Sequence, residues 1–478
     1  MMRRRELLKA LAAVPLVMGV PSLAWSAGAE RRILFGGVSP EYPPAAITTL
    51  GAWPEDLTGT LYRNGPALFE RNGYRHPHWF DGDGMVHRFH LSGSGISHSS
   101  RYVRTSKFVA EERAARFLSE GVTSEVPNGL PLAHNDAANT ANISVRKIGD
   151  KLFALWESGS AYELDPDSLK TLGVNVLNDD LKHAPFSAHP LMDSNGSWWN
   201  IGSWVFGDNG ALLVYHLNAQ GELKRYKLLQ LAQKGYVHAF AISPQYLVVL
   251  NSACLYTPST GFVEGFDFDS TGKSQIVLID KNTLDIARVV DIPANFAFHF
   301  SIAREEKGFL TVSMAEYTNA DIMLKGMRHG SPSFGRDSYP SLLVTYRINL
   351  ATGAWQKESA GVDMEFPQYR LEDPYSHQLL YGIGRTNGVY PGFSNSLVAV
   401  DSRSGEARHY FYNGHTAAEE PLIVRSRSHK EYVIQPWLDL KAMRSGLSLF
   451  RAHSVAEGPI ASAVLDYPLP LGFHGCFV

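Results

Sequence analysis

The chain has 478 residues, of which 44% are hydrophobic and 19% charged, and its formal net charge is −3. This length allows two or three domains of average size, or one large all-β domain. The near-neutral charge and the lack of a basic stripe exclude nucleic acid as a partner. The two cysteines, Cys254 and Cys476, are too few for a disulfide framework or a thiolate metal site. They form one disulfide or stay two free thiols.

The first thirty residues have the composition of an export signal. Arg3-Arg4-Arg5 precede an apolar run from Ala10 to Val20, and Ala27-Gly28-Ala29 then offers a small-residue cleavage site. This order is typical of a secretory signal. The apolar run is shorter than the about 20 residues that cross a bilayer.

The pattern Arg4-Arg5-x-Leu7-Leu8-Lys9 favours a signal of the twin-arginine type. The alternatives are an ordinary secretory signal or an uncleaved anchor. We therefore expect a signal peptide over 1–29, a single domain over 30–478, and a periplasmic or exported protein.

Short runs rich in β-branched and aromatic residues, bounded by Gly, Pro, Asn and Asp, predict many strands in the mature chain. They cover Ile143–Arg146, Leu152–Trp156, Leu212–Leu217, Tyr246–Leu250, Gln275–Ile279, Leu310–Met314, Leu342–Ile348, Ser396–Val400 and Tyr432–Gln435. The best helix candidate is Ala110–Ser119.

One turn pattern recurs, in which a strand ends at Asp or Asn and a short polar turn follows. It begins at Asp165, Asn218, Asp280, Asn349 and Asp401, at spacings of 53, 62, 69 and 52 residues. Asp and Asn suit such turns because their side chains bond the backbone two residues on. A propeller blade takes about 40–50 residues plus its loop insertions. The spacing favours a β-propeller, with a sandwich or an irregular all-β fold as the alternative.

No glycine-rich phosphate loop, GxSxG, HExxH or CxxC motif is present, so the chemistry must come from residues far apart in sequence. Four histidines lie in apolar or aromatic settings beside turns. They are in Ser187-Ala188-His189-Pro190, Tyr236-Val237-His238-Ala239-Phe240, Phe298-His299-Phe300 and Gly472-Phe473-His474-Gly475. Their position alone does not single them out from the 18 histidines of the chain.

A collinear series of blocks resembles the carotenoid cleavage oxygenase family, which includes apocarotenoid, carotenoid and lignostilbene oxygenases and a retinoid isomerohydrolase. The series starts with Gly59–Pro66 and Phe80-Asp81-Gly82-Asp83-Gly84-Met85-Val86-His87. It continues with Leu155-Trp156-Glu157, Tyr162–Pro166, Ser187-Ala188-His189-Pro190, the block from His238 to Tyr246, Phe298-His299, Glu365-Phe366-Pro367, Glu419-Glu420-Pro421 and Gly472-Phe473-His474-Gly475. Each block alone is weakly specific, and their common order over most of the mature chain carries the resemblance.

The resemblance implies that His189, His238, His299 and His474 hold one iron(II) ion. It implies that the carboxylates of Glu157, Glu365 and Glu420 support these histidines from behind. Carboxylates that accept the outer ring N–H groups fix the imidazole tautomer and offset the metal charge. Imidazole also suits copper, nickel and zinc, so only the resemblance selects iron. The expected fold is all-β, a seven-bladed β-propeller with a cap of helices and loops over the iron site.

Some positions depart from the family pattern. Ala239 follows the second histidine where the family has Asp, Ile302 stands where it has Asn, and Ser313 where a following strand carries Asp. The Asn-Thr turn of the family corresponds to Asn142-Ile143. No expected ligand is lost, so the departures indicate a divergent member with an altered substrate pocket.

The implied reaction is oxidative cleavage of a conjugated C=C bond by dioxygen to two carbonyl products. The partners would be a lipophilic polyene and dioxygen, with peripheral membrane contact, and Phe117 and Leu118 are candidates for an apolar contact patch. Trp156, Phe298 and Tyr102 are candidate tunnel residues. The lack of a lysine between Lys107 and Lys147 favours a carotenoid or apocarotenoid over a lignostilbene. The alternatives are stilbene cleavage, a retinoid-like isomerase or hydrolase, and a binding propeller without activity.

Overall fold

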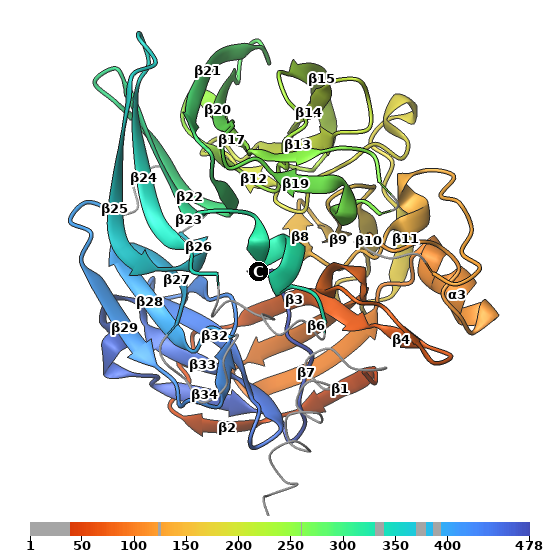
Figure 1. Ribbon diagram of the computed structural model, residues 1–478. Helices are drawn as coiled ribbons and strands as arrows, with labels where there is room; N and C mark the ends of the chain where they lie inside the picture. Colours follow the sequence, from red (N-terminus) through yellow and green to blue (C-terminus); the bar gives the residue numbers. More distant parts are fainter. Residues whose placement is uncertain (1–38, 123–125, 260, 330–338, 370–378, 386–392) are drawn as a thin grey trace, which may run out of the picture.

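The computed structural model describes residues 39–122, 126–259, 261–329, 339–369, 379–385 and 393–478. The predicted signal peptide over 1–29 lies outside these residues. Seven sheets of four or more strands are arranged around a central axis, so the predicted seven-bladed β-propeller is confirmed (Figure 1).

Five consecutive blades contain four antiparallel strands each, and each follows chain order from the centre of the ring outwards (Figure 1). The first has β8 (Ser144–Ile148), β9 (Lys151–Leu155), β10 (Tyr162–Leu164) and β11 (Thr171–Val174); the second has β12 (Leu191–Met192), β13 (Trp198–Trp204), β14 (Gly210–Leu217) and β15 (Leu223–Leu231). The third has β16 (Phe240–Ile242), β17 (Tyr246–Asn251), β20 (Lys273–Asp280) and β21 (Ile286–Pro293); the fourth has β22 (Phe296–Glu306), β23 (Phe309–Tyr317), β24 (Leu342–Asn349) and β25 (Trp355–Asp363). The fifth has β26 (Glu365–Gln368), β27 (Leu379–Gly384), β28 (Ser396–Asp401) and β29 (Ala407–Phe411).

The two remaining blades combine both ends of the chain and thereby close the ring. The sixth has β30 (Thr416–Ala418), β31 (Leu422–Arg425), β32 (Glu431–Asp439), β33 (Arg444–Arg451), β34 (Ala461–Val464) and the N-terminal β2 (Thr48–Gly51). The seventh has β1 (Tyr42–Ala46), β7 (Gly95–Tyr102), β6 (Asp83–Ser92), β3 (Gly59–Leu68) and the C-terminal β35 (Gly475–Phe477). Two small hairpins, β4 (Glu70–Arg71) with β5 (Tyr74–Arg75) and β18 (Cys254–Tyr256) with β19 (Phe266–Phe268), lie outside the blades.

Burial explains why the inner strands are apolar runs and the outer strands alternate. In β17 and β28 nearly every residue is buried, because neighbouring blades cover both faces of these strands. In the outer strands β15 and β21 partly buried and exposed residues alternate, since only one face meets a neighbour. The largest hydrophobic clusters lie between blades, as in the cluster that contains Leu250 and Met314.

The predicted strands and recurrent turns are confirmed. Each turn joins the third strand of a blade to its fourth, and in each the Asp or Asn side chain accepts a hydrogen bond from a backbone N–H. The donors belong to Ser168, Gln220, Asn282, Ala351 and Arg403, for the turns that begin at Asp165, Asn218, Asp280, Asn349 and Asp401. The five matching turns are therefore the repeat signal of the propeller.

The helix predicted over Ala110–Ser119 is wrong in its bounds, because α3 runs from Ser106 to Ala114. Its N-terminus is set by Thr105, whose hydroxyl accepts a hydrogen bond from the Phe108 N–H. It ends where Ala115 adopts a left-handed conformation with φ of 52°.

Phe117 and Leu118 lie beyond this helix, and Phe117 is only 1% exposed, so it is not part of a membrane-facing patch. Cys254 and Cys476 are buried and free, which rules out the disulfide between them.

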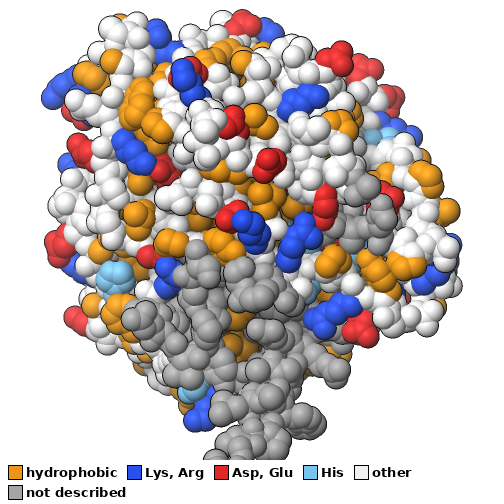
Figure 2. Space-filling view, viewed as in Figure 1, with side chains coloured by type: hydrophobic (Ala, Val, Ile, Leu, Met, Phe, Trp, Pro, Cys, Tyr) orange, Lys and Arg blue, Asp and Glu red, His pale blue; other side chains and the backbone are white. Residues whose placement is uncertain are grey.

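On the face seen in Figure 2, Lys and Arg side chains alternate with Asp and Glu, as the small net charge suggests. Among the described residues no helix is both long and apolar enough to cross a membrane. Short helical turns cover the centre of the ring instead, above all η2 (Trp79–Asp81) and η6 (Ile322–Gly326).

Candidate metal centre

The four predicted histidines come together at the centre of the propeller. His189 precedes β12, His238 precedes β16, and His474 precedes β35, so each stands where the chain enters an innermost strand. Innermost strands of different blades meet at the axis, which brings together four histidines whose successive members are separated by up to 175 positions in the sequence.

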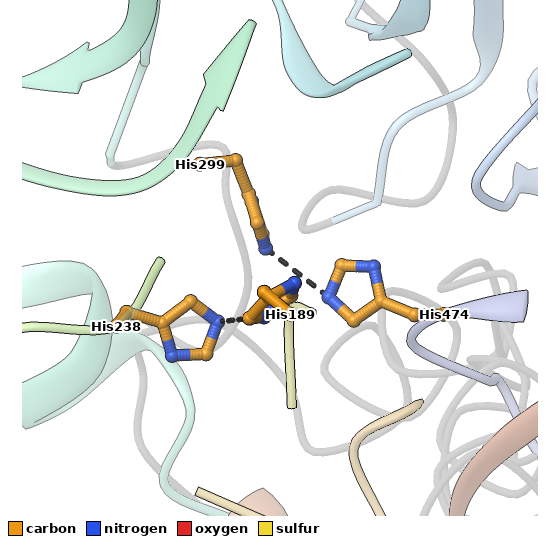
Figure 3. A group of neighbouring side chains, drawn as sticks. All are labelled: His189, His238, His299 and His474. Atoms are coloured by element: carbon orange, nitrogen blue, oxygen red, sulfur yellow. Dashed lines mark hydrogen bonds between the residues drawn. The ribbon is translucent and has the colours of Figure 1, made fainter. Parts of the chain in front are cut away.

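His299 reaches the same point from within a strand, through a β-bulge. Between the pairs Ala297–Glu316 and Phe300–Met314, strand β22 has one more residue than β23. A bulge redirects the side chains within it, and bulges are frequent beside active sites. The Phe298-His299 step lies in this bulge, which turns the His299 ring towards the axis (Figure 3).

The Nε2 atoms of the four rings point at a common centre (Figure 3). His189 Nε2 is 2.9 Å from His238 Nε2, and His299 Nε2 is 3.1 Å from His474 Nε2. One ligand atom from each histidine lies within 4.8 Å of the others. Ligands at right angles on a metal with bonds of about 2.1 Å lie about 3.0 Å apart. The spacing therefore fits adjacent ligands of one metal ion.

Three carboxylates hold three of these rings from the opposite side. His238 Nδ1 is 3.1 Å from Glu157 Oε2, His299 Nδ1 is 2.6 Å from Glu365 Oε2, and His474 Nδ1 is 2.8 Å from Glu420 Oε1. Glu365 and Glu420 are buried, and Glu420 also accepts a hydrogen bond from the Gly475 N–H. The structure thus pairs each predicted carboxylate with a different predicted ligand.

These pairs decide which ring nitrogen carries the hydrogen. A carboxylate accepts hydrogen bonds, so the Nδ1 atoms of the three histidines donate and their Nε2 atoms present lone pairs. Burial and the neighbouring histidines hold the pKa values of His189 and His474 well below the usual range, which keeps both imidazoles neutral. Close lone pairs repel each other unless a cation lies between them, so the donor set fits a bound metal ion.

Tyr236 is a member of this site that the sequence analysis did not single out. Its hydroxyl donates a hydrogen bond of 2.9 Å to Glu157 Oε2, the oxygen that also accepts from His238. Burial and the Glu157 carboxylate raise the pKa of Tyr236 well above its usual value, so the phenol keeps its hydrogen. The signal in the sequence is the spacing of two residues, which places Tyr236 and His238 on one side of an extended segment.

Phe366 is a second such residue. Its ring centroid is 4.9 Å from those of both His299 and His474, and its backbone N–H donates to Glu365 Oε2 at 2.8 Å. Its φ of 50° is unusual for a non-glycine residue and is typical of strained positions at functional sites. Phe366 therefore covers two ligands on one side.

An apolar cavity opens onto the cluster, with His238, His299 and His474 in its wall. Phe298, one of the candidate tunnel residues, lies on this wall together with Trp79, Phe80, Phe366 and Phe473. Such a wall excludes water and suits a long apolar ligand.

A second, smaller cavity lies on the other side of Phe80 and Ile143, two residues that line both cavities. Trp156 lines this second cavity, beside Glu157 and Tyr236. Tyr102 packs in a separate core cluster with Phe108 and lines neither cavity.

The Asp81-Gly82-Asp83-Gly84 block is held against the segment around Asn142, next to the main cavity. Asn142 Nδ2 donates to the backbone oxygens of Phe80 and Gly82, at 2.9 and 2.7 Å. A side chain at Gly84 would stand 2.3 Å from the backbone oxygen of Ala141, so only glycine fits this approach. The block therefore positions Phe80 and Ile143 at the cavity.

A second group of possible ligands, His134, Asp136 and His183, lies nearer the surface. The Asp136 carboxylate already accepts hydrogen bonds from Asn139, from the N–H and hydroxyl of Ser160, and from His183. A carboxylate has about four acceptor positions, so Asp136 is saturated by the protein. Through the two hydrogen bonds from Ser160 to Asp136, this group fixes the segment that follows Glu157 in the chain.

Comparisons with known proteins show the family of the chain. The sequence profile of the retinal pigment epithelial membrane protein family, RPE65, matches residues 35–478. The apocarotenoid-15,15'-oxygenase of Synechocystis sp. is 29% identical over 456 residues, which cover 89% of this chain and 91% of that protein. The carotenoid 9,10(9',10')-cleavage dioxygenase 1 of Arabidopsis thaliana is 26% identical, covering 93% of this chain and 88% of that protein.

The solved structure of cobalt-substituted Synechocystis ACO superimposes with a TM-score of 0.84 at 25% identity and covers 94% of this chain and 98% of that one. An ACO/RPE65 chimera superimposes with a TM-score of 0.85 at the same identity. The chain therefore belongs to the retinal pigment epithelial membrane protein family, the family of the carotenoid cleavage oxygenases that its sequence blocks resemble.

Proposed function

We propose that the protein is a non-haem iron(II) dioxygenase that cleaves a conjugated C=C bond of a carotenoid or apocarotenoid. The observation that carries this proposal is the convergence of four histidine rings beside an apolar, aromatic cavity, with His238, His299 and His474 in its wall. The relatives named as carotenoid and apocarotenoid oxygenases support the same substrate class.

The overall reaction consumes one dioxygen and one C=C bond, and each carbon of that bond receives one oxygen atom as an aldehyde or ketone. The bound iron supplies the activation of dioxygen. His189, His238, His299 and His474 would hold the ion, and Glu157, Glu365 and Glu420 keep three of the rings in the required tautomer. Neutral imidazoles leave the ion its full double charge, which the nearby carboxylates offset.

The cavity residues bind and orient the polyene. The rings of Phe298, Phe366 and Phe473 offer flat apolar surfaces beside the ligand histidines. A conjugated chain is flat and apolar, so these surfaces match it without requiring a polar group. They also exclude water from the reacting carbon atoms.

Stilbene cleavage is less well supported by the cavity. Lys107 is buried and paired with Asp83 and Glu111, at 2.9 and 2.8 Å. No lysine is among the described residues that line the main cavity. A phenol-binding lysine, as expected in lignostilbene-cleaving relatives, therefore has no counterpart in this wall.

Export and membrane contact are further parts of the proposal. The basic residues before Ala10–Val20 support export by the twin-arginine route to the periplasm. Phe206 is 46% exposed and contacts Tyr256 and Phe262, and Phe262 lines the second cavity. This exposed aromatic group supports a peripheral contact with a lipid surface, in which a lipophilic substrate would be dissolved. The contact would lie near the second cavity.

The test is anaerobic purification, metal quantification, and measurement of oxygen uptake with a panel of apocarotenals and stilbenes. We expect one iron per chain and one dioxygen consumed per polyene cleaved. Products formed without oxygen uptake would favour an isomerase or hydrolase of a retinoid-like substrate. Failure to bind iron after reconstitution would refute the oxygenase.

A further inference from the structure

Two segments far apart in the chain join to form the cover of the main cavity. One is 76–81, which contains η2, and the other is 322–329, which contains η6. Backbone hydrogen bonds connect them, from Trp79 N to Met327 O at 2.9 Å and from His329 N to Pro77 O at 2.6 Å. We call this pair of segments the clasp.

His78 lies at the centre of the clasp and is 0% exposed. Its Nδ1 accepts a hydrogen bond of 3.1 Å from the Phe80 N–H, which caps η2. Its Nε2 lies 2.9 Å from the backbone oxygen of Met323 in η6. A carbonyl oxygen only accepts, so Nε2 carries the hydrogen and the ring uses both nitrogens, one towards each segment.

Burial supports this assignment, because it lowers the pKa of His78 to about 3 and so keeps the ring neutral with one donor and one acceptor. A buried ring that satisfies both nitrogens has one orientation, since a flip would leave a buried N–H or lone pair without a partner. The two hydrogen bonds of the His78 ring therefore fix η2 relative to η6, in addition to the packing of the ring between them.

Both segments place side chains on the cavity wall. Trp79 and Phe80 come from the first, and Ile322 and Met327 from the second. Phe80 also separates the main cavity from the second cavity beside Glu157. The position of this ring thus sets how far a rigid chain extends past the metal centre.

We infer that His78 is a positioning residue for regiospecificity: by joining η2 to η6 it holds Phe80 in place and so determines which double bond of the polyene faces the metal. This inference rests on the proposed function. A polyene is nearly rigid, so a shift of its end by one double bond moves a different bond to the metal. Loosening the clasp should therefore change the bond that is cut before it abolishes cleavage.

Three substitutions separate the two hydrogen bonds of the ring. His78→Asn keeps a short acceptor that caps Phe80 N, as Asn does at helix N-termini, but cannot reach Met323. His78→Gln offers an amide donor with the reach of Nε2. His78→Ala removes both. For each variant we would measure the distribution of carbonyl products, the iron content, and hydrogen exchange of 79–81 and 322–329.

We expect one main product pair from the wild-type protein and a mixture from His78→Ala and His78→Asn, with iron content unchanged. We expect backbone exchange in 322–329 to rise about tenfold in these two variants, the factor that corresponds to one lost hydrogen bond. His78→Gln should restore part of the product specificity.

His98→Asn is the matched control. His98 is equally buried, at 1% exposed, and both of its ring nitrogens are bonded, to His87 and Tyr467, away from both cavities. It should lower stability to a similar extent and leave the products unchanged.

An unchanged product distribution in His78→Ala would overturn the inference, and so would unchanged exchange in both segments. The same mixture of products in His98→Asn would also overturn it, because the effect would then reflect general loosening. If the wild-type protein cleaves none of the polyenes, the proposed function fails. The exchange of the clasp still decides whether His78 joins the two segments.

Discussion

The hydroxyl of Tyr236 and the ring of His238 share one oxygen of the Glu157 carboxylate, at 2.9 and 3.1 Å. A carboxylate fixed by a second donor has less freedom to rotate away from the imidazole that it orients. The groups that orient the ligand His238 therefore extend over two further side chains, first Glu157 and then Tyr236.

This relationship predicts graded effects on metal affinity. Glu157→Gln should weaken iron binding about 10–100-fold, the usual cost of losing a carboxylate behind a ligand. Tyr236→Phe should weaken it by less, because Glu157 remains. Competition with a chelator would measure both. Glu316→Gln, which alters a buried carboxylate bonded to Tyr346 and Asn295, is the control and should have no effect. Equal losses in Tyr236→Phe and Glu316→Gln would contradict the prediction.

Metal removal should destabilise the fold. Without a cation the Nε2 atoms of His299 and His474 bring lone pairs together, because both Nδ1 atoms donate to carboxylates, and a ligand that binds only the native state stabilises it. We expect the thermal midpoint to fall on chelation and to recover when iron(II) is restored. In His299→Ala the midpoint should no longer respond to the chelator. A wild-type midpoint that is insensitive to the chelator would show that the ligands are held apart by the protein alone.

Acid should destabilise the protein through its buried histidines. Burial lowers the pKa of His98 from the usual histidine value of about 6.5 to about 3. Below pH 6.5 the unfolded chain binds a proton that the folded chain does not, so stability is full above pH 6.5 and falls as the pH approaches 3. One such group contributes about 1.4 kcal/mol per pH unit in this range. His98→Asn should therefore give a shallower dependence of the urea midpoint on pH, and an unaltered slope would refute this.

The thiols should be inert in the native protein. Burial raises the pKa of Cys254 to about 12 and also raises that of Cys476, and both side chains are buried. A thiol reagent attacks the thiolate, so reaction at pH 8 should await unfolding. Titration should give no rapid reaction in buffer and two thiols per chain in denaturant. One or two rapidly reacting thiols in the native state would contradict the burial of these residues.

The repeat of the fold could be predicted because its turns are local. The side chain of Asp165 or Asp401 accepts a hydrogen bond from a backbone N–H two or three residues further along the chain. This preference depends only on a few adjacent residues, so it can be recognised in the sequence. A related turn at Asp439, between β32 and β33, was not included among the predicted turns, although Asp439 accepts from the Lys441 N–H in the same way. This turn contains no glycine, unlike the turns that begin at Asn218, Asn349 and Asp401.

The site could be predicted only through the resemblance. Its residues come together when the blades form the ring, and no fixed spacing in the sequence links them. Nothing local in Phe298-His299-Phe300 reveals the bulge that turns His299 inward, since the extra residue exists only relative to β23. Trp156 follows Leu155 in a strand-like run, yet whether it faces the main or the second cavity depends on Phe80. Likewise Thr105, rather than hydrophobic periodicity, sets where α3 begins.

Ring closure has a consequence for the order of events during synthesis. His474 lies directly before β35, and β35 pairs with β3 through Leu61, Tyr62 and Arg63. His474, the last of the four ligands in the chain, and β35, the strand that closes the ring, therefore leave the ribosome almost together. The strands of the other blades have been made before them. A nascent chain that has not yet made this strand has an open ring and three of the four ligands, so iron loading should wait until β35 has been made and paired with β3.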